Sequence, residues 1–345
     1  MQAIQITAPH FVDMVERPIP TPKQGEALLR ILYGGICGSD LGSYRGTFAY
    51  VSYPRIPGHE FSAEIVEIGQ NDLGFTSGMV VTANPYFNCG HCYACCRGLV
   101  NACMENQTMG VQRDGAFSQY ITMPINRLYD GYGLPPTALA MIEPLCIAYH
   151  GVQKAKAKEG ETVLVMGAGT IGILCAFTLQ SMKANVYVAD IDPVKLQFAQ
   201  SLGFTNTLLN DDPNHFTELV QRVTNHNGFD IVVEAVGASS TFLSCIDAAA
   251  YGGRVVQIGV GKQDAVFNFT QIQKKELHIH GSRNALEEDF HNVLAMLSHH
   301  DIPLERLISR TYPFTEASDA FEYFSQGSGV RMKILLDFTK EKTNG

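Results

Sequence analysis

Residues 162–172 read TVLVMGAGTIG, an apolar run that passes directly into three closely spaced glycines. A short run of β-branched and large apolar residues favours a buried strand. In the GxGxxG pattern of Gly167, Gly169 and Gly172, the first glycine permits a tight turn and the second lets the backbone approach a pyrophosphate. The third lets a helix pack against the strand. This stretch therefore predicts a strand, a dinucleotide-binding turn and a helix.

Asp190 ends the next apolar run, NVYVAD, eighteen residues after Gly172. A carboxylate at this place accepts the ribose hydroxyls of NAD and repels the 2′-phosphate of NADP, so NAD is the expected cofactor. Thr170 and Ile171, inside the glycine turn, complete the predicted cofactor contacts. The alternative is a sheet whose turn merely needs small residues, with Asp190 as a solvated strand end.

Strand-like and helix-like segments alternate from about residue 147 to 281, which predicts a parallel, doubly wound sheet. Asp192 followed by Pro193 predicts a helix start, because Asp caps free N–H groups and Pro at the first position loses no hydrogen bond. Residues 1 to about 146 instead contain short β-like runs separated by Gly and Pro, which predict a strand-rich, barrel-like unit. The chain is thus expected to be an α/β protein of two domains.

Five cysteines lie within fifteen residues, CGHCYACCRGLVNAC, and four of them, at positions 89, 92, 95 and 103, form a regularly spaced set. The spacing of Cys89, Cys92, Cys95 and Cys103 suits one tetrahedral ion, and four thiolates leave no open position, so a structural zinc is predicted. The alternative is a disulfide-bonded lobe. Cys96 is an adjacent thiol that could shift the register of the ligand set.

The composition excludes several classes of protein. A net charge of −9 disfavours a nucleic-acid partner, which would need clustered Lys and Arg. Charged residues at 17% and glycine-interrupted apolar runs favour a protein with no membrane span. Nine cysteines with no secretory leader predict a reducing compartment, and the cytoplasm is the expected location.

A second candidate metal set is spread along the first half of the chain: Cys37 in GICGSD, His59 in PGHEF and Glu143 in MIEPL. Each is weak evidence alone, because buried Cys and His are often packing residues. The motifs follow the order GICGSD, PGHE, CxxCxxCx7C, DGAFSQY, IEP and GxGxxG. This order closely resembles the zinc-dependent medium-chain alcohol and polyol dehydrogenases, from Met1 to about Phe338.

The resemblance implies a GroES-like β-barrel catalytic domain of residues 1–146 and 282–345 and a Rossmann NAD-binding domain of residues 147–281. It also implies two zinc ions per chain, one structural and one catalytic, and the oxidation of an alcohol by hydride transfer to NAD. The family usually forms homodimers or homotetramers, and a strand such as GRVVQIGV is expected to pair across a two-fold axis.

In the sorbitol dehydrogenase branch, residues matching Cys37 and His59 bind the catalytic zinc, and a glutamate provides the third ligand. Glu143 is the favoured candidate and Glu60 the alternate. Three protein ligands leave one position for water or the substrate alcohol. By the same resemblance, Ser39 carries away the alcohol proton.

Two further features bear on the substrate and its proton. Many relatives have a histidine at the position of Gly42, so the usual imidazole relay is missing and the proton must leave by another route. Arg283 in HGSRNA matches a pocket arginine of polyol dehydrogenases, and the alternative is an arginine paired to an internal acid. Tyr44 is placed near the mouth of the site. Asp40 is expected to orient His59.

The stretch around Arg283 is similar to the branch that oxidises sugar acids such as gulonate, galactonate or idonate at C5. A hexonate is therefore the expected substrate, and a neutral polyol such as sorbitol is second. Galactitol phosphate and threonine remain open. A non-enzymatic binding role and a zinc-free quinone reductase rank lower, because Cys37, His59 and Glu143 are all present.

Overall fold

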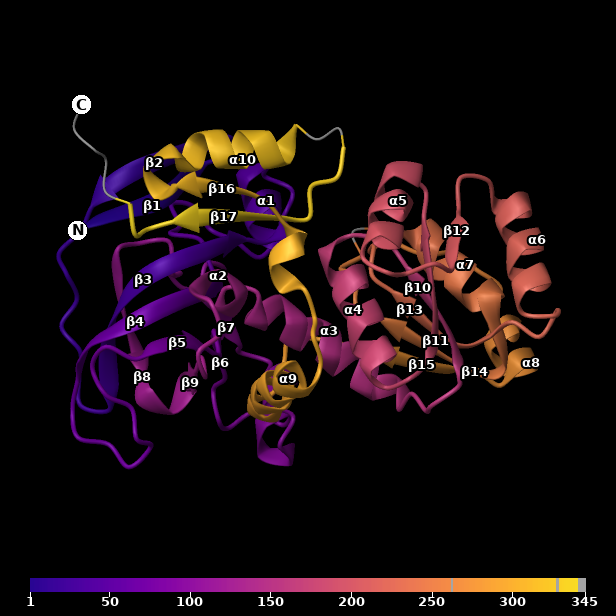
Figure 1. The fold of residues 1–345 in the computed structure, drawn as a ribbon, viewed down its shortest axis with the longest axis horizontal. Helices are drawn as coiled ribbons and strands as arrows, with labels where there is room; N and C mark the ends of the chain where they lie inside the picture. Colours follow the sequence, from indigo (N-terminus) through magenta and orange to yellow (C-terminus); the bar gives the residue numbers. More distant parts are fainter. Residues whose placement is uncertain (262, 327–328, 341–345) are drawn as a thin grey trace. The chain divides into compact units, whose positions relative to one another are not determined.

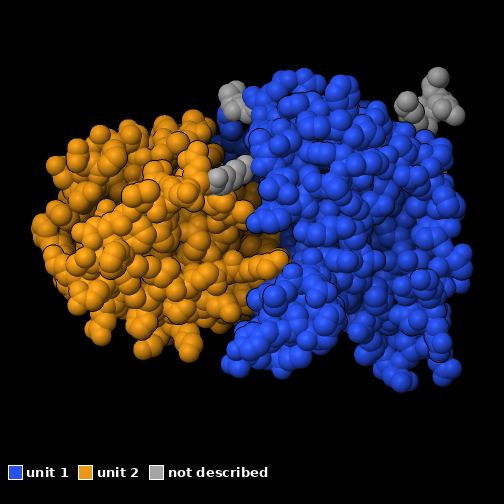
Figure 2. Space-filling view, turned by 180° about the vertical axis from the view of Figure 1, so that it is seen from behind, with its two compact units in different colours: residues 1–143, 285–295, 303–345 blue, residues 144–284, 296–302 orange. Residues whose placement is uncertain are grey.

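The computed structural model describes residues 1–261, 263–326 and 329–340. The chain forms two compact units, coloured separately in Figure 2. Unit 1 contains residues 1–143, 285–295 and the chain from 303 onward, and unit 2 contains residues 144–284 and 296–302. The predicted domain limits at 146 and 281 lie close to these changes of unit. The segment 296–302, however, packs with unit 2, and the predicted end at residue 345 lies outside the described residues.

Unit 1 is rich in strands, as its Gly- and Pro-punctuated sequence predicts. Its strands are β1 (Gln2–Ala8), β2 (Phe11–Glu16), β3 (Glu26–Ile36), β4 (Glu60–Ile68), β5 (Val80–Ala83), β6 (Tyr86–Phe87), β7 (Gln107–Thr108), β8 (Tyr120–Pro124), β9 (Leu128–Asp130), β16 (Ile308–Pro313) and β17 (Lys333–Asp337). A seven-stranded sheet has the order β16-β17-β3-β4-β5-β9, and β8 also pairs with β3. The pairs β1-β2 and β6-β7 form two small sheets.

An aromatic cluster lies in the core of unit 1, together with apolar residues of β3 and β4. Phe314 and Phe338 stack with ring centroids 4.8 Å apart, and Phe117 lies 6.5 Å from Phe338. Burying each such side chain contributes about 1.5–3 kcal/mol to folding. The helices of this unit are α1 (Gly38–Tyr44), α2 (Pro136–Leu139), most of α9 (Glu287–His299) and α10 (Ala317–Ser325), and α10 lies beside β16 and β17 in Figure 1.

Unit 2 is built on a parallel six-stranded sheet in the order β12-β11-β10-β13-β14-β15. The strands are β10 (Thr162–Met166), β11 (Asn185–Asp190), β12 (Thr207–Leu209), β13 (Phe229–Glu234), β14 (Ala249–Gln257) and β15 (His278–Gly281). The predicted alternation of strands and helices is confirmed. The strand order reverses between β10 and β13, which is the topological switch point of a doubly wound sheet.

Helices cover both faces of this sheet (Figure 1). They are α4 (Thr170–Ser181), α5 (Pro193–Ser201), α6 (Pro213–Val223), α7 (Ser239–Ala248) and α8 (Thr270–Lys275), and most of α3 (Ile142–Ala155) also belongs to unit 2. On one face, Phe216 of α6 and Ile246 of α7 pack with Phe229 of β13. The predicted start of α5 is confirmed, because the Asp192 side chain accepts from Val194 N–H at 2.8 Å.

Among the helices of the described residues, none has the length and apolar character to cross a bilayer. The expectation that GRVVQIGV pairs across a two-fold axis is wrong, because β14 is hydrogen-bonded on both sides, to β13 and to β15. An inner strand has no free backbone groups for another chain, and on that side of the sheet β15 is the edge strand.

Candidate functional site

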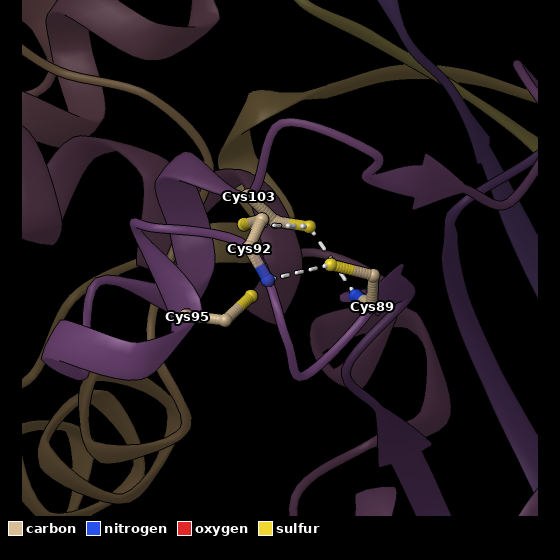
Figure 3. A group of neighbouring side chains, drawn as sticks. All are labelled: Cys89, Cys92, Cys95 and Cys103. Atoms are coloured by element: carbon tan, nitrogen blue, oxygen red, sulfur yellow. Dashed lines mark hydrogen bonds between the residues drawn. The ribbon is translucent and has the colours of Figure 1, made fainter.

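The four cysteines of the 89–103 segment converge on one point. Their Sγ atoms all lie within 4.8 Å of one another, and Figure 3 shows the side chains turned toward a common centre. The loop after β6 carries Cys89 and Cys92, and two short 3-10 turns, 95–97 and 100–102, bring Cys95 and Cys103 to the same place. Backbone N–H groups support the cluster, since Cys89 N donates to Cys103 Sγ at 3.2 Å.

The chemistry of this cluster suits a metal ion. Hydrogen bonds from the backbone of Cys95 and then Met104 lower the pKa of the Cys92 thiol to about 6, which favours the thiolate that binds zinc. All nine cysteines lie in the described part of the chain, and each is a free thiol. Cys96 is exposed and its Sγ contacts the carbonyl of His91, so it lies outside the set of four. The set fits a closed, structural zinc site.

A second group lies at the start of α1 and of β4 in unit 1. Cys37 is the N-cap of α1, and His59 and Glu60 lie where the chain enters β4. One ligand atom from each of the three residues lies within 4.8 Å of the others. His59 is 5% exposed and Glu60 1% exposed. A thiol, an imidazole and a carboxylate that converge in a buried place form a donor set typical of catalytic zinc.

Asp40 and Ser39 flank this group. The Asp40 carboxylate accepts from Cys37 N–H at 3.0 Å and Gly58 N–H at 3.3 Å, so it fixes the loops that carry both ligands. Its Oδ1 is 3.9 Å from His59 Nδ1, and Ser39 Oγ is 3.5 Å from His59 Nε2. Burial alone would lower the pKa of His59, but the charges of Asp40 and Cys37 raise it well above its usual value.

The two candidate glutamates have different surroundings. Glu60 forms a buried ion pair with Lys333 of β17, whereas Glu143, in the first turn of α3, accepts a hydrogen bond from the Tyr86 hydroxyl. Burial raises the pKa of Glu143 to about 7. The group within 4.8 Å contains the alternate ligand Glu60 and not the favoured Glu143. The geometry therefore favours Glu60 as the carboxylate of this group.

The residues present fit a zinc ion at this place. His59 Nδ1 is buried and has no hydrogen-bond partner among the described residues. Gly35 leaves the space that the carboxylate needs, because a Cβ there would lie 2.5 Å from Glu60 Oε2. The donor set Cys37, His59 and Glu60 would hold the ion and leave one position open.

Three other predicted residues are placed as follows. A Cβ on Gly42 would lie 3.2 Å from Phe48 Cβ, so a histidine here would require Phe48 to move. Tyr44 is buried in the core of unit 1, with its ring 5.5 Å from that of Phe321 and 5.1 Å from that of His10. Packing accounts for this ring, and its substrate contact stays a prediction. Arg283 is an exposed residue of unit 2.

The glycine turn of unit 2 has the geometry that its sequence predicts. Gly167 has a φ of +105°, which side-chain-bearing residues rarely adopt. Gly169 is the N-cap of α4, with no atom within 4 Å of a Cβ placed on it. A Cβ on Gly172 would lie 1.7 Å from the carbonyl oxygen of Gly167. Thr170 and Ile171 lie in the first turn of α4, and the N-terminus of a helix is a place where backbone N–H groups bind a phosphate.

Asp190 lies at the end of β11, next to this turn. Its Oδ2 accepts from Ala168 N–H at 2.8 Å and its Oδ1 from Asp192 N–H at 3.0 Å. Each carboxylate oxygen has a second lone pair, which leaves acceptor capacity for ribose hydroxyls. Lys195 Nζ lies 3.8 Å from Oδ2. The carboxylate therefore supports the turn and is also available to a ligand.

The chain matches known protein families over both units. Residues 23–132 match the alcohol dehydrogenase GroES-like domain, and residues 170–299 match the zinc-binding dehydrogenase domain. L-galactonate-5-dehydrogenase of Escherichia coli K12 is 34% identical over 307 residues, which cover 89% of this chain and 90% of the relative. The chain belongs to the zinc-type medium-chain alcohol dehydrogenase family. It is accordingly a zinc-dependent dehydrogenase of CH–OH groups, with a GroES-like domain and a Rossmann-type domain.

Other members of the family cover nearly the whole chain. Sorbitol dehydrogenase of Halalkalibacterium halodurans is 32% identical, with 95% of each chain covered. Among solved structures, the alcohol dehydrogenase rspB of E. coli CFT073, in complex with NADH, has a TM-score of 0.90 and 31% identity, and the match covers 98% of this chain and 99% of that one. Both matches extend over the part of the chain that carries the ordered motifs.

Sequence reasoning missed two residues that contact the candidate glutamates: Lys333, which pairs with Glu60, and Tyr86, which bonds to Glu143. Lys333 is 273 residues away from Glu60 in the chain, and its only local signal is a lysine at the head of the apolar run KILLDF. Burial alone would lower the pKa of Lys333, but the Glu60 carboxylate raises it above its usual value. Tyr86 has no local signal that separates it from an ordinary core tyrosine.

Proposed function

We propose that this dehydrogenase oxidises a secondary alcohol of a sugar acid, a hexonate at C5, to the ketone, with NAD as hydride acceptor and a catalytic zinc. The observation that carries the proposal is the convergence of Cys37, His59 and Glu60 within 4.8 Å in a buried part of unit 1. Three ligands from the protein leave room for the substrate alcohol, as catalysis requires.

Several residues of the chain have distinct roles in the proposed reaction. Zinc, when bound, supplies Lewis-acid chemistry that lowers the pKa of an alcohol. Ser39, whose Oγ is 3.5 Å from His59 Nε2, receives the alcohol proton. Residue 42 is glycine, and a Cβ there would lie 3.2 Å from Phe48 Cβ, so no imidazole takes the proton at this position and it leaves Ser39 by another route, such as water. Asp40 holds both ligand loops through Cys37 N–H and Gly58 N–H.

NAD is the proposed cofactor because Asp190 ends β11 beside the glycine turn, where its negative charge opposes a 2′-phosphate. The solved relative with NADH supports this choice. Residues 147–281 are proposed as the NAD-binding domain, and residues 1–146 and 282–345 as the catalytic domain. A homodimer or homotetramer is also proposed, and light scattering on the purified protein tests it.

The hexonate substrate is supported by the similarity to L-galactonate-5-dehydrogenase. Arg283 carries a planar guanidinium, the group that pairs best with a carboxylate such as that of a sugar acid. A neutral polyol is the second candidate, because sorbitol dehydrogenase is also similar. Arg283→Met separates the two: it is expected to lower kcat/KM for a hexonate about tenfold or more while changing that for sorbitol little.

The deciding experiment measures NADH formation at 340 nm with a panel of hexonates, polyols, galactitol phosphate and threonine, with and without a chelator. Cys37→Ser is expected to abolish turnover without unfolding the protein. The matched control is Cys96→Ser, the exposed thiol outside both metal groups, which should leave turnover unchanged. Full activity of Cys37→Ser would refute the catalytic zinc site. Turnover of polyols alone would refute the hexonate.

A further inference from the structure

A buried carboxylate at the end of β13 has no part in the chemistry described so far. Glu234 is 0% exposed. Its Oε1 accepts from the N–H groups of Val236 (3.1 Å) and Gly237 (2.9 Å) and from the Thr241 hydroxyl (2.6 Å). Its Oε2 accepts from Gly237 N–H (3.1 Å) and the Gln257 side-chain amide (2.6 Å). The backbone N–H groups and the Gln257 amide are donors only, so both carboxylate oxygens of Glu234 act as hydrogen-bond acceptors.

Glu234 joins two loops of unit 2. The first loop, residues 235–238, follows β13, and the second, residues 258–261, follows β14. The carbonyl of Glu234 accepts from the N–H groups of Ile258 (2.9 Å) and Gly259 (3.1 Å) of the second loop. Gln257, which donates to the carboxylate, also donates to the Gly259 carbonyl at 2.7 Å. Glu234 therefore bonds to the first loop and to Gln257 through its carboxylate, and to the second loop through its carbonyl.

Two glycines let these loops touch backbone to backbone. Gly237 has a φ of +82°, and a Cβ on it would lie 2.5 Å from the Val260 carbonyl oxygen. A Cβ on Gly259 would lie 2.2 Å from Gly237 N and 2.5 Å from Glu234 Oε2. A side chain at either position would push the loops apart, so their close approach is built into the sequence.

The loops lie where a doubly wound sheet binds its ligand, beyond the carboxyl ends of the strands at the switch point. The half formed by β10, β11 and β12 carries the glycine turn and Asp190, which belong to the pyrophosphate and the adenosine ribose. The half formed by β13, β14 and β15 is left for the other mononucleotide. At its edge Val236 is 50% and Val260 63% exposed, which offers an apolar surface to a flat ring.

We infer that Glu234 is a positioning residue that shapes these two loops to receive the nicotinamide half of NAD. The inference rests on the proposed NAD-dependent function. A Cβ on Gly167 would lie 2.7 Å from Val236 Cγ2, so the first loop also contacts the glycine turn. Glutamine at residue 234 would turn an NH2 group toward donors, and the loops would have to separate to restore hydrogen bonds.

The test compares two probes on the zinc-loaded protein by calorimetry: NADH, and ADP-ribose, which lacks the nicotinamide. Glu234→Gln is expected to weaken NADH binding about tenfold, the equivalent of about 1.4 kcal/mol. Binding of ADP-ribose is expected to stay within about threefold of the wild type, because its contacts belong to the other half of the sheet. The variant should also lower kcat, since a displaced ring receives hydride poorly.

The matched control is Glu161→Gln, the same substitution in the same unit at the amino end of β10. Glu161→Gln should change the affinity neither for NADH nor for ADP-ribose. If Glu234→Gln does not fold, Thr241→Val, which removes one donor to Oε1, decides the question with an expected loss of about threefold for NADH alone. Equal losses for NADH and ADP-ribose, or none, would overturn the inference. A wild-type protein that binds neither probe would instead refute the proposed cofactor.

Discussion

Replacing Gly172 by alanine tests the glycine turn most directly. The new Cβ would lie 1.7 Å from the Gly167 carbonyl oxygen, and real Cβ atoms essentially never come within 3.0 Å of such an atom, so the backbone must open by more than 1 Å. The obstacle is backbone rather than a flexible side chain, and Gly167 N–H is itself bonded to the Ala189 carbonyl at 2.7 Å. We expect a loss of about 3 kcal/mol in the free energy of unfolding, at the upper end of overpacking costs.

Gly169→Ala is the matched control, because it adds the same methyl group at the second glycine of the same motif. No atom lies within 4 Å of a Cβ there, and the φ of −82° suits alanine. The change at this N-cap should cost less than about 1 kcal/mol of stability. It should nevertheless weaken NADH binding about tenfold or more, since the methyl group stands where the pyrophosphate approaches.

Urea and thermal unfolding, both followed by far-UV circular dichroism, measure the stability loss of Gly172→Ala. Titration of NADH fluorescence measures the affinity of Gly169→Ala for the cofactor. The melting temperature of Gly172→Ala should fall by about 6–12 °C, at about 2–4 °C per kcal/mol for a unit of this size. A Gly172→Ala protein as stable as Gly169→Ala would refute the packing argument. Unchanged NADH affinity in Gly169→Ala would refute the pyrophosphate role of the turn.

Four other predictions concern the metal lobe and unit 2. Cys103→Ser should remove one of two zinc ions per chain, measured by plasma mass spectrometry, and an unchanged zinc content would contradict a four-cysteine site. Asp192→Ala removes the cap on Val194 N–H and should cost about 1 kcal/mol in urea unfolding. Arg254 donates hydrogen bonds to the Glu161 carboxylate and to the Ala155 carbonyl. Glu161→Gln, which weakens the first bond, should cost about 1 kcal/mol of stability, and Arg254→Met, which removes both bonds, should cost more. Burial alone would raise the pKa of Glu161, but the hydrogen bond from Arg254 holds this pKa below its usual value. The ionised carboxylate therefore stabilises the fold, and the stability difference between wild type and Glu161→Gln should shrink as the pH falls through the lowered pKa.

Much of unit 2 could be predicted from the sequence because its signals are local. The strand 162–166, the glycine turn and the helix start at Pro193 each depend on residues within a few positions of one another. The cysteine lobe is equally local, since its four thiols lie within fifteen residues and a small loop can bring them together. The predicted pairing of GRVVQIGV failed because strand order depends on contacts along the whole sheet, which place β15 outside β14.

The sequence by itself determined the two-part α/β organisation, the GxGxxG turn, the four-cysteine set and the pair Cys37 and His59. Only the tertiary structure showed that Glu60, and not the favoured Glu143, lies within 4.8 Å of that pair, because the two glutamates are 83 positions apart and their distances to Cys37 depend on how the strands and helices pack. It also paired Glu60 with Lys333, buried Tyr44 in a core and tied Glu234 to two loops. Spacing along the chain encodes local geometry, whereas these contacts arise when distant strands pack and exclude water, so that each buried charge must find its partner within the fold.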